Sequence, residues 1–272
     1  MVCRRRKDGS LPISSADMEP ITSRQNKLIR HLRRLSRERA YRREQGAFVC
    51  DGLKLLDEAV HNDARIGLVL LREGGARPDP AVLGDTPVYL AGEEVFSYVS
   101  PLENSPGPLF TVSFPAPGEE TPDRVMVLEN IQDPGNVGTV LRTAAAMGCE
   151  LVILTGKCAD PYNPKTIRAA MGALFREPLA ELSLAETKEK LSRWGLPLYG
   201  AALSPDAADV RSLRLDRAAV AVGNEGHGLS AELLDLCEKK IIIPMTPGSE
   251  SLNAAVAASI LMWEMARGEQ AL

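Results

Sequence analysis

The sequence predicts an α/β protein in which a small N-terminal α/β domain precedes a larger domain built on a largely parallel sheet. In the second half, short apolar runs alternate with helical patterns, from VMVLEN and TVLRTAAAMG through ELVILTG and a helix expected near 164–174 to IIIPM and a final helix ending at Arg267. Strand, helix and strand at this spacing indicate a parallel sheet with helices on both faces. The proline-rich stretch PAPGEETPD separates this pattern from a shorter α/β pattern before it.

The composition is that of an ordinary soluble protein, with 272 residues, 44% hydrophobic and 25% charged. No apolar run reaches 18 residues, and the basic start is followed by Ser, Pro and Asp, so we expect neither a membrane span nor a signal peptide. The five cysteines are an odd set without CxxC spacing, and only three histidines occur. We therefore expect reduced thiols in a cytoplasmic protein and no metal centre.

Charge is distributed unevenly along the chain. Residues 1 to 43 hold 13 Lys/Arg against 4 Asp/Glu, a net charge of +9, whereas the net charge of the whole chain is −4. Residues 1–19 lack hydrophobic periodicity and are interpreted as a flexible basic tail. The basic end is a candidate contact for a polyanion.

A helix is expected after Ser23, which is a candidate N-cap. Its apolar positions Leu28, Ile29, Leu32 and Leu35 fall on one face. Basic residues surround that face: Arg24, Lys27, Arg30, Arg33, Arg34 and Arg37. A solvated helix face and a polyanion contact are about equally good interpretations of this pattern.

The rest of the first half predicts a small α/β unit. A strand is expected at 47–50, a helix at 53–61, a strand at 67–71 and further strands around 88–90 and 109–114. We assign 20–114 to a first domain, 115–123 to a linker and 124–272 to a second domain.

Three segments of the second domain place Gly, Asn and charged residues directly after a predicted strand, where open α/β sheets bind ligands. The first, ENIQDPGNVGTVLRTAAAMG, has turn chemistry up to Asn136 and a helix expected from about Val137, with Arg142 in its second turn. By itself it also fits a capped turn with a surface arginine.

The second segment, AAVAVGNEGHGLS, sets three glycines around Glu225, which permits close backbone approach to a flat ligand. It does not fit the dinucleotide-binding fingerprint, and the chain has no phosphate-binding P-loop. In the third segment a strand expected to be buried, IIIPM, leads through a Pro/Gly/Ser loop into an alanine-rich helix. Its small residues allow close backbone packing.

Taken together, the three segments resemble the SpoU, or TrmH-like, branch of the SPOUT RNA methyltransferases. The family's three motifs stand in order as NIQDPGNVGTVLRTA, VGNEGHGLS and IPMTPGSESLNAAVA, within residues 124 to 267. Residues 20–114 resemble the family's frequent N-terminal RNA-binding domain, which is built like a small ribosomal protein. The resemblance implies a C-terminal trefoil knot, a homodimer and S-adenosylmethionine as methyl donor.

The resemblance also implies the site residues. The donor would be held at Gly223, Ile243, Met245 and Leu252, and the functional polar set falls on Asn136, Arg142, Glu225, Ser251 and Asn253. The family's arginine is generally proposed to activate the ribose hydroxyl, but a guanidinium is not normally deprotonated in proteins. We therefore expect Arg142 to bind the target phosphate and stabilise the developing alkoxide, with the final proton acceptor open and base catalysis by Glu225 retained as an alternative.

The function expected from this resemblance is methyl transfer from S-adenosylmethionine to a ribose 2′-hydroxyl of structured RNA, with no metal required. The extra N-terminal domain favours ribosomal RNA, and the basic helix would then contact RNA. The alternatives are methylation of transfer RNA, methylation of a base, or a non-catalytic RNA-binding or ribosome-assembly factor with the same fold.

Overall fold

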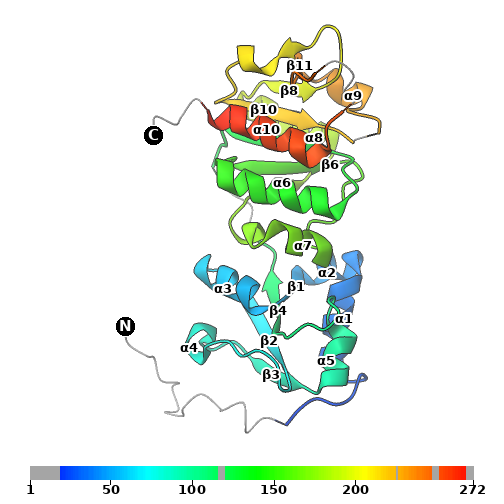
Figure 1. Ribbon diagram of the computed structural model, residues 1–272, viewed down its shortest axis with the longest axis vertical. Helices are drawn as coiled ribbons and strands as arrows, with labels where there is room; N and C mark the ends of the chain where they lie inside the picture. Colours follow the sequence, from blue (N-terminus) through cyan, green and yellow to red (C-terminus); the bar gives the residue numbers. More distant parts are fainter. Residues whose placement is uncertain (1–18, 116–119, 225, 247–250, 268–272) are drawn as a thin grey trace. The chain divides into compact units, whose positions relative to one another are not determined.

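The computed structural model describes residues 19–115, 120–224, 226–246 and 251–267 (Figure 1). They divide into two compact units. Unit 1 holds the described residues up to Pro115 together with Tyr162–Pro164, and unit 2 holds the others. Within these described ranges, no helix has both the length and the apolar character that a membrane span requires.

Unit 1 is built on a four-stranded sheet in the order β1-β4-β2-β3. β4 is antiparallel to β1 and β2, while β2 and β3 are parallel. The strands are β1 (Ala47–Asp51), β2 (Ile66–Arg72), β3 (Val88–Ala91) and β4 (Leu109–Ser113). The helices are α1 (Lys27–Arg37), α2 (Arg39–Gln45), α3 (Leu53–His61), α4 (Pro80–Leu83) and α5 (Glu93–Val99). All strands predicted in this half, and the helix over 53–61, are present.

The core of unit 1 forms where α1 and α5 cover one face of this sheet. Leu32 of α1 and Phe96 of α5 pack with Leu70 of β2, and all three side chains are fully buried. The predicted cap of α1 is wrong. Asn26 caps the helix by accepting a hydrogen bond from the amide of Leu28, whereas Ser23 accepts one from Gln25 in the turn before it.

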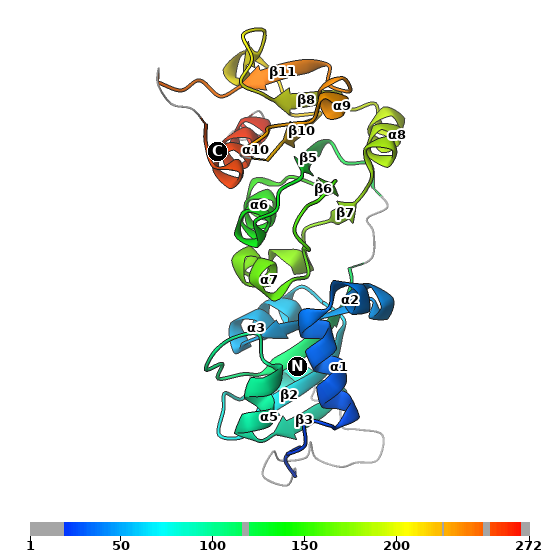
Figure 2. The same cartoon turned by 90° about the vertical axis from the view of Figure 1, so that its right-hand side faces the viewer.

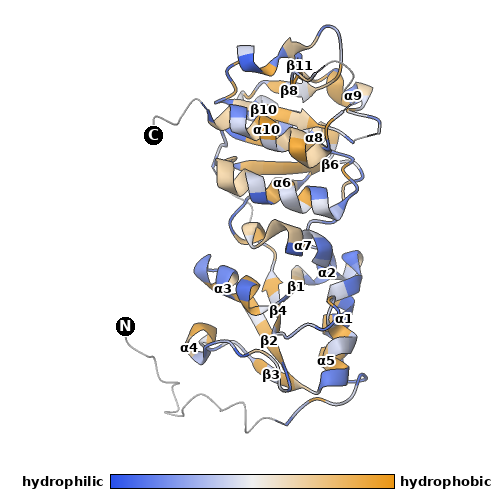
Figure 3. Ribbon diagram, viewed as in Figure 1, coloured by the Kyte–Doolittle hydropathy of each residue, from blue (hydrophilic) through white to orange (hydrophobic). Residues whose placement is uncertain are grey.

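Unit 2 contains a seven-stranded sheet in the order β7-β6-β5-β10-β8-β11-β9, and every neighbouring pair in it is parallel. This confirms the prediction of a large parallel sheet. Its strands are β5 (Arg124–Glu129), β6 (Leu151–Thr155), β7 (Leu179–Glu181), β8 (Leu198–Ala201), β9 (Ala208–Asp209), β10 (Ala218–Val222) and β11 (Lys239–Ile242). Hydrophobic residues concentrate in these strands (Figure 3).

Helices cover both faces of the sheet, as predicted (Figure 2). On one face Leu191 of α8 and Leu233 of α9 pack on Val125 and Ala219. On the other face α10 contacts α6, β5 and β10. The helices of unit 2 are α6 (Pro134–Met147), α7 (Pro164–Ala170), α8 (Leu184–Trp194), α9 (Ala231–Leu234) and α10 (Ala254–Ala266), with 3₁₀ turns η2 (Ala173–Phe175) and η3 (Val210–Ser212).

Strand order gives unit 2 a topological switch point. On one side of β5 the sheet continues with β6 and β7, which follow β5 along the chain. On its other side β5 is paired with β10, beyond which lie β8, β11 and β9. Ligands of open α/β sheets bind outside the carboxyl ends of the strands at such a point. In unit 2 these ends carry the loops after Glu129 of β5 and Val222 of β10.

Three local predictions in unit 2 need correction. α6 begins at Pro134 rather than near Val137, because Asp133 caps it by accepting a hydrogen bond from the amide of Asn136 and proline suits the first turn. Arg142 therefore lies in the third turn. The helix expected to reach Leu174 stops at Ala170, where Met171 and Gly172 take positive φ. β11 is only partly buried, because it lies next to the edge strand β9.

Candidate active site

A cavity of about 540 Å³ opens at the carboxyl ends of three adjacent strands of unit 2. Its walls come from the ends of β8, β10 and β11, from the turn after β10 and from the start of α10. All four residues predicted to hold a methyl donor line this cavity: Gly223, Ile243, Met245 and Leu252. Ser251 lines it with them. Among the described lining residues only His227 is ionisable, so the cavity wall is mainly aliphatic side chains and backbone.

Gly223 is required by the tight turn beside this cavity. A Cβ atom added there would lie 2.2 Å from the carbonyl carbon and oxygen of Gly228. No side chain fits at that distance, so the backbone itself forms this part of the cavity wall. The turn is closed by a hydrogen bond of 2.8 Å from the amide of Gly228 to the carbonyl oxygen of Asn224.

Two of the predicted polar residues meet directly. The side-chain amide of Asn253 donates a 3.1 Å hydrogen bond to the amide oxygen of Asn136, and the Asn253 oxygen accepts from the backbone of Ala255 and Val256 at the start of α10. Further along, the hydroxyls of Thr143 and Ser259 lie 3.3 Å apart. α6 and α10 therefore run side by side in the same direction.

Within the described part of the chain, neither Arg142 nor Ser251 is joined to this pair. Arg142 is exposed on α6 and makes no hydrogen bond or ion pair with any other described residue. Ser251 is exposed and lines the cavity. Glu225 lies outside the described residues. The structure thus places the four residues predicted to hold the donor around one cavity and Asn136 against Asn253. Arg142 lies further along α6 and has no partner among the described residues.

Sequence reasoning missed two links between the loops. The buried carboxylate of Glu129 accepts hydrogen bonds of 2.7 and 2.6 Å from the backbone amide and hydroxyl of Ser230, which also caps α9. The side-chain amide of Asn224 donates a 3.3 Å hydrogen bond to the carbonyl oxygen of Asn130. Both links join the first motif to the second, and no local sequence signal pairs residues so far apart.

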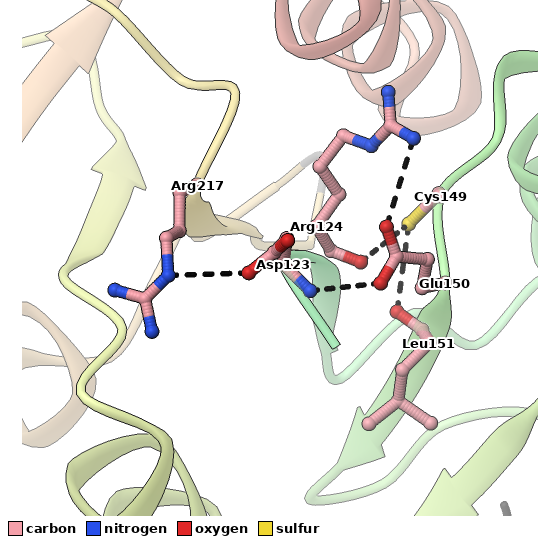
Figure 4. A network of polar contacts seen from close by, with 6 residues as sticks. All are labelled: Asp123, Arg124, Cys149, Glu150, Leu151 and Arg217. Carbon is pink, nitrogen blue, oxygen red and sulfur yellow. Dashed lines mark hydrogen bonds and ion pairs between the residues drawn. The ribbon is translucent and has the colours of Figure 1, made fainter. Parts of the chain in front are cut away.

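A separate polar network lies at the amino end of β5 (Figure 4). Arg217 contacts Asp123 at 3.1 Å, and Glu150 accepts from the Asp123 amide and lies 3.6 Å from Arg124. Beside it, burial raises the pKa of the Cys149 thiol to about 12. A thiol held protonated in this way is a poor nucleophile. This end of the sheet therefore stabilises the fold rather than offering a reactive group.

One carboxyl group has a strongly shifted pKa. Burial raises the pKa of Glu177 to about 8, against the opposing effect of Arg176, and its Oε1 atom is buried without a hydrogen-bond partner. Glu177 precedes β7 at the edge of the sheet. Among the described residues, no cluster of three or more His, Cys, Asp or Glu side chains has the arrangement of a metal site.

The six basic residues predicted around α1 fall into two groups. Arg24 pairs with Glu94 and lies over the Tyr98 ring, Arg33 stacks on Tyr98 with 3.6 Å to the ring centroid, and Arg34 pairs with Glu38. The remaining cations have no partner among the described residues and lie opposite the buried face of the helix: Lys27, Arg30 and Arg37. We call these three the α1 stripe.

Family models match both parts of the chain. The SpoU rRNA Methylase family matches residues 123–263, and an MRM3-like substrate binding domain matches residues 26–109. The first matched segment belongs to unit 2 except for Tyr162–Pro164, and the second belongs to unit 1.

Individual relatives extend over nearly the whole chain. The 23S rRNA (guanosine(2553)-2′-O)-methyltransferase RlmP of Bacillus subtilis is 31% identical, covering 91% of this chain and 99% of the relative. A solved RNA 2′-O ribose methyltransferase is 31% identical with a TM-score of 0.75, covering 92% of this chain and 98% of its own. An AdoMet-bound rRNA methyltransferase from Sinorhizobium meliloti is 26% identical with a TM-score of 0.78, covering 93% and 99%.

Proposed function

The chain belongs to the SpoU rRNA methylase family, and from this premise we propose that it transfers a methyl group from S-adenosylmethionine to a ribose 2′-hydroxyl of ribosomal RNA. The observation that carries the proposal is the cavity at the ends of β8, β10 and β11, which gathers all four residues expected to hold the donor. Two of the relatives named above are 2′-O-methyltransferases, of 23S rRNA and of RNA, and the third is an AdoMet-bound rRNA methyltransferase.

The cavity fits this donor in size and chemistry. Its volume of about 540 Å³ lies within the range of small-molecule sites, which are mainly apolar with a few polar groups that fix orientation. The aliphatic chains of Ile243, Met245 and Leu252 suit the flat adenine, and the exposed backbone around Gly223 offers hydrogen bonds to its edges. When bound, S-adenosylmethionine supplies an electrophilic methyl group, so the reaction requires no metal.

The protein's own residues align and activate the attacking hydroxyl. Asn136 and Asn253 hold the starts of α6 and α10 together. Asn136 helps to orient Arg142, and Asn253 acts with Ser251 on the donor or the target oxygen. Arg142 binds the target phosphate and stabilises negative charge on the attacking oxygen, as a fixed cation does in a site with little water. Ser251 fixes the donor or the target oxygen at the cavity rim, and Glu225 orients Arg142 or accepts the proton.

The fold of the C-terminal segment is a trefoil knot in this proposal. The support is the position of the two elements that the C-terminal segment joins. β11 lies next to the edge strand β9. α10 then packs against β5 and β10 at the centre of the sheet. Buried alanines at 254, 255 and 258 permit the close approach that such threading requires.

The active protein is a homodimer, with a second copy covering α10. This helix has no distinct polar face, since Ser259 and Glu264 are the only polar residues in it, and such a helix is typical of a buried position. Two of its large side chains nevertheless remain exposed, Val256 at 48% and Trp263 at 52%. An exposed apolar surface on a helix beside the site is expected at a subunit interface.

The division of labour follows the two units. Residues 20–114 bind RNA and 124–272 perform the transfer, with 115–123 as the segment between them. The basic tail expected over 1–19, apart from Glu19, and residues 116–119 of the expected linker lie outside the described residues. The α1 stripe supports the first assignment, because three cations without a partner in the described part of the chain are available to phosphate. The four described cysteines are free thiols, which fits a reducing compartment such as the cytoplasm.

Incubation of the full chain with labelled S-adenosylmethionine and unmodified ribosomal RNA tests the proposal. Nuclease digestion and mass analysis of nucleosides should find 2′-O-methylated ribose at one position. A methylated base would change the reaction class, label only in transfer RNA would change the substrate, and RNA binding without transfer would favour a non-catalytic assembly factor.

A further inference from the structure

Asn130 connects three loops at the carboxyl end of the unit 2 sheet. Its side-chain oxygen accepts a 2.8 Å hydrogen bond from the backbone amide of Lys157, in the loop between β6 and α7. Its carbonyl oxygen accepts the 3.3 Å hydrogen bond from Asn224, in the loop after β10. One residue after β5 thus ties the β6–α7 loop to the loop that borders the cavity.

The backbone at Asn130 is adapted to this connection. Its φ of 57° lies in the left-handed region, which asparagine tolerates better than most residues. The neighbouring Gly156 also has positive φ, and a Cβ atom there would lie 2.4 Å from the Asn130 side-chain oxygen. Both positions are therefore restricted by the contact between Asn130 and the β6–α7 loop.

The link extends to the cavity through Asn224. Its side-chain oxygen accepts a 2.9 Å hydrogen bond from the amide of Gly226, and both residues line the cavity. A second contact strengthens the other side of the link, since the amide of Ala159 donates a 2.8 Å hydrogen bond to the carbonyl oxygen of Ile131. The β6–α7 loop is held at two points beside the first motif.

The side chain held by this loop is an exposed cation. Lys157 forms no side-chain hydrogen bond or ion pair with another described residue. Two further exposed cations in the same condition, Arg142 and Arg168, lie on α6 and α7, which touch where Gly138 faces Ala169. Glu150 directly precedes β6, whereas Lys157 follows this strand. The Glu150 carboxylate contacts Asp123 and Arg124 at the amino end of β5.

Resting on the proposed function, we propose that Lys157 is an RNA-phosphate contact within unit 2 and that Asn130 is the positioning residue that holds it beside the donor cavity. An exposed ammonium without a carboxylate partner suits a phosphate, to which lysine binds as a point charge. Phosphate contacts fix the register of a nucleic acid without reading its sequence. A contact beside the cavity fixes which ribose reaches the methyl donor.

Lys157→Ala in the full chain tests the contact, with Lys188→Ala as its control. Lys188 is an exposed lysine of α8, on the sheet face opposite α6 and α10, and it too has no described partner. The probe is ribosomal RNA, titrated at several salt concentrations, with S-adenosylhomocysteine binding measured in parallel. We expect Lys157→Ala to weaken RNA binding roughly three- to tenfold and lower the salt slope by about one, with product affinity unchanged.

The control should match the wild type in both titrations. If the two lysine variants bind RNA equally well, Lys157 is not a contact and the inference fails. The proposed function fails separately, through absence of 2′-O-methylation by the wild-type protein, so the two failures can be told apart.

Asn130→Gly tests the positioning role, because glycine keeps the left-handed backbone and removes the side-chain acceptor. Asn104→Gly in unit 1 is its control, since Asn104 also has positive φ. If Asn130 acts through Lys157, Asn130→Gly raises the KM for RNA with little change in kcat. The double variant Asn130→Gly/Lys157→Ala then binds RNA within twofold of Lys157→Ala alone. Additive losses, or an equal loss of S-adenosylhomocysteine affinity, would show a general structural defect and overturn the role.

Discussion

The Asn253 side-chain amide donates a 3.1 Å hydrogen bond to the side-chain oxygen of Asn136. These residues come from the third and first motifs and stand at the starts of α10 and α6. The same Asn253 side chain caps α10 through its oxygen. One residue therefore both begins the last helix and fixes it against the helix that carries Arg142.

The two roles of Asn253 can be separated by substitution. Asn253→Ala removes cap and bridge, and we expect a loss of about 1 kcal/mol in the free energy of unfolding together with slower methyl transfer. Asn253→Ser retains a capping hydroxyl but is too short to reach Asn136. It should keep most of the stability and lose activity as the alanine variant does. Urea denaturation and single-turnover methylation measure the two effects; an active serine variant would show that the bridge is dispensable.

Glu177→Gln should stabilise the protein at neutral and alkaline pH. The pKa of Glu177 rises on folding from about 4.5 to about 8 because of burial, so the folded state retains a proton that the unfolded state releases. The stability associated with this group is complete below pH 4.5 and declines as the pH rises to 8. Glutamine mimics the protonated form and removes this decline, a difference on the order of 3 kcal/mol at pH 7.

Urea unfolding at pH 5 and pH 8 measures the effect. The gain should be small at pH 5 and larger at pH 8, and the exposed Glu120→Gln variant should show neither. A gain that does not grow with pH would contradict the shifted pKa.

Removal of the α1 stripe, Lys27→Ala/Arg30→Ala/Arg37→Ala, should weaken RNA binding and reduce its salt dependence by about three, since each cation that meets a phosphate contributes about one unit. Alanine favours helix, so α1 should remain folded. Lys54→Ala, an exposed lysine of α3, is the control in the same unit. Equal RNA affinity for wild type and triple variant would leave the stripe as a solvated face.

Hydrophobic patterns in the sequence located the strands of unit 1 and the long buried strands of unit 2, but not its short edge strands β7 and β9. β5 and β10 are buried along their whole length, and such runs are legible in any sequence. Helix starts were less well predicted, since Ser23 and Asn26 are both capable caps and only packing selects between them. α8 was missed, although Ser183 and Glu186 form a capping box that the sequence displays.

The candidate site was also predicted only in part from the sequence. The motifs identified Gly223 and Leu252, which the structure brings to one cavity. The pairs Glu129–Ser230 and Asn130–Asn224 join residues from different strand ends, so they depend on the strand order β5-β10, which no local pattern specifies. Polar residues whose partner is distant in sequence are therefore found only in the fold.

Trp263→Ala should weaken self-association if α10 lies at a subunit interface. Burial of this half-exposed indole would contribute substantially to dimer stability, because aromatic side chains dominate interface energetics. Light scattering should detect dimers of the wild type at micromolar concentration and a shift to monomers in the variant. Tyr89→Ala, at an exposed aromatic of unit 1, should have no effect. A fully active wild-type monomer would exclude the dimer proposal.

Arg142→Ala should leave the affinity for S-adenosylmethionine nearly unchanged and lower the rate of methyl transfer by about two to three powers of ten. Arg142 is absent from the described lining of the cavity, so donor binding does not depend on it. It lies on α6, the helix whose start Asn136 shares with Asn253, and its guanidinium has no described partner to satisfy. Loss of a cation beside a developing oxyanion should cost roughly 3 to 4 kcal/mol in the transition state.

Arg142→Lys distinguishes charge from geometry. A compact ammonium supplies the charge without the planar fork that engages phosphate and hydroxyl together, so we expect poor rescue. The measurement is single-turnover methylation at saturating donor, with calorimetric titration of the donor on the same preparations. A near-normal rate for the alanine variant would make Arg142 a bystander, and activation would then have to come from the other polar residues, Glu225 foremost. Full rescue by lysine would instead show that a positive charge with N–H donors is sufficient and that the planar geometry of the guanidinium is not needed.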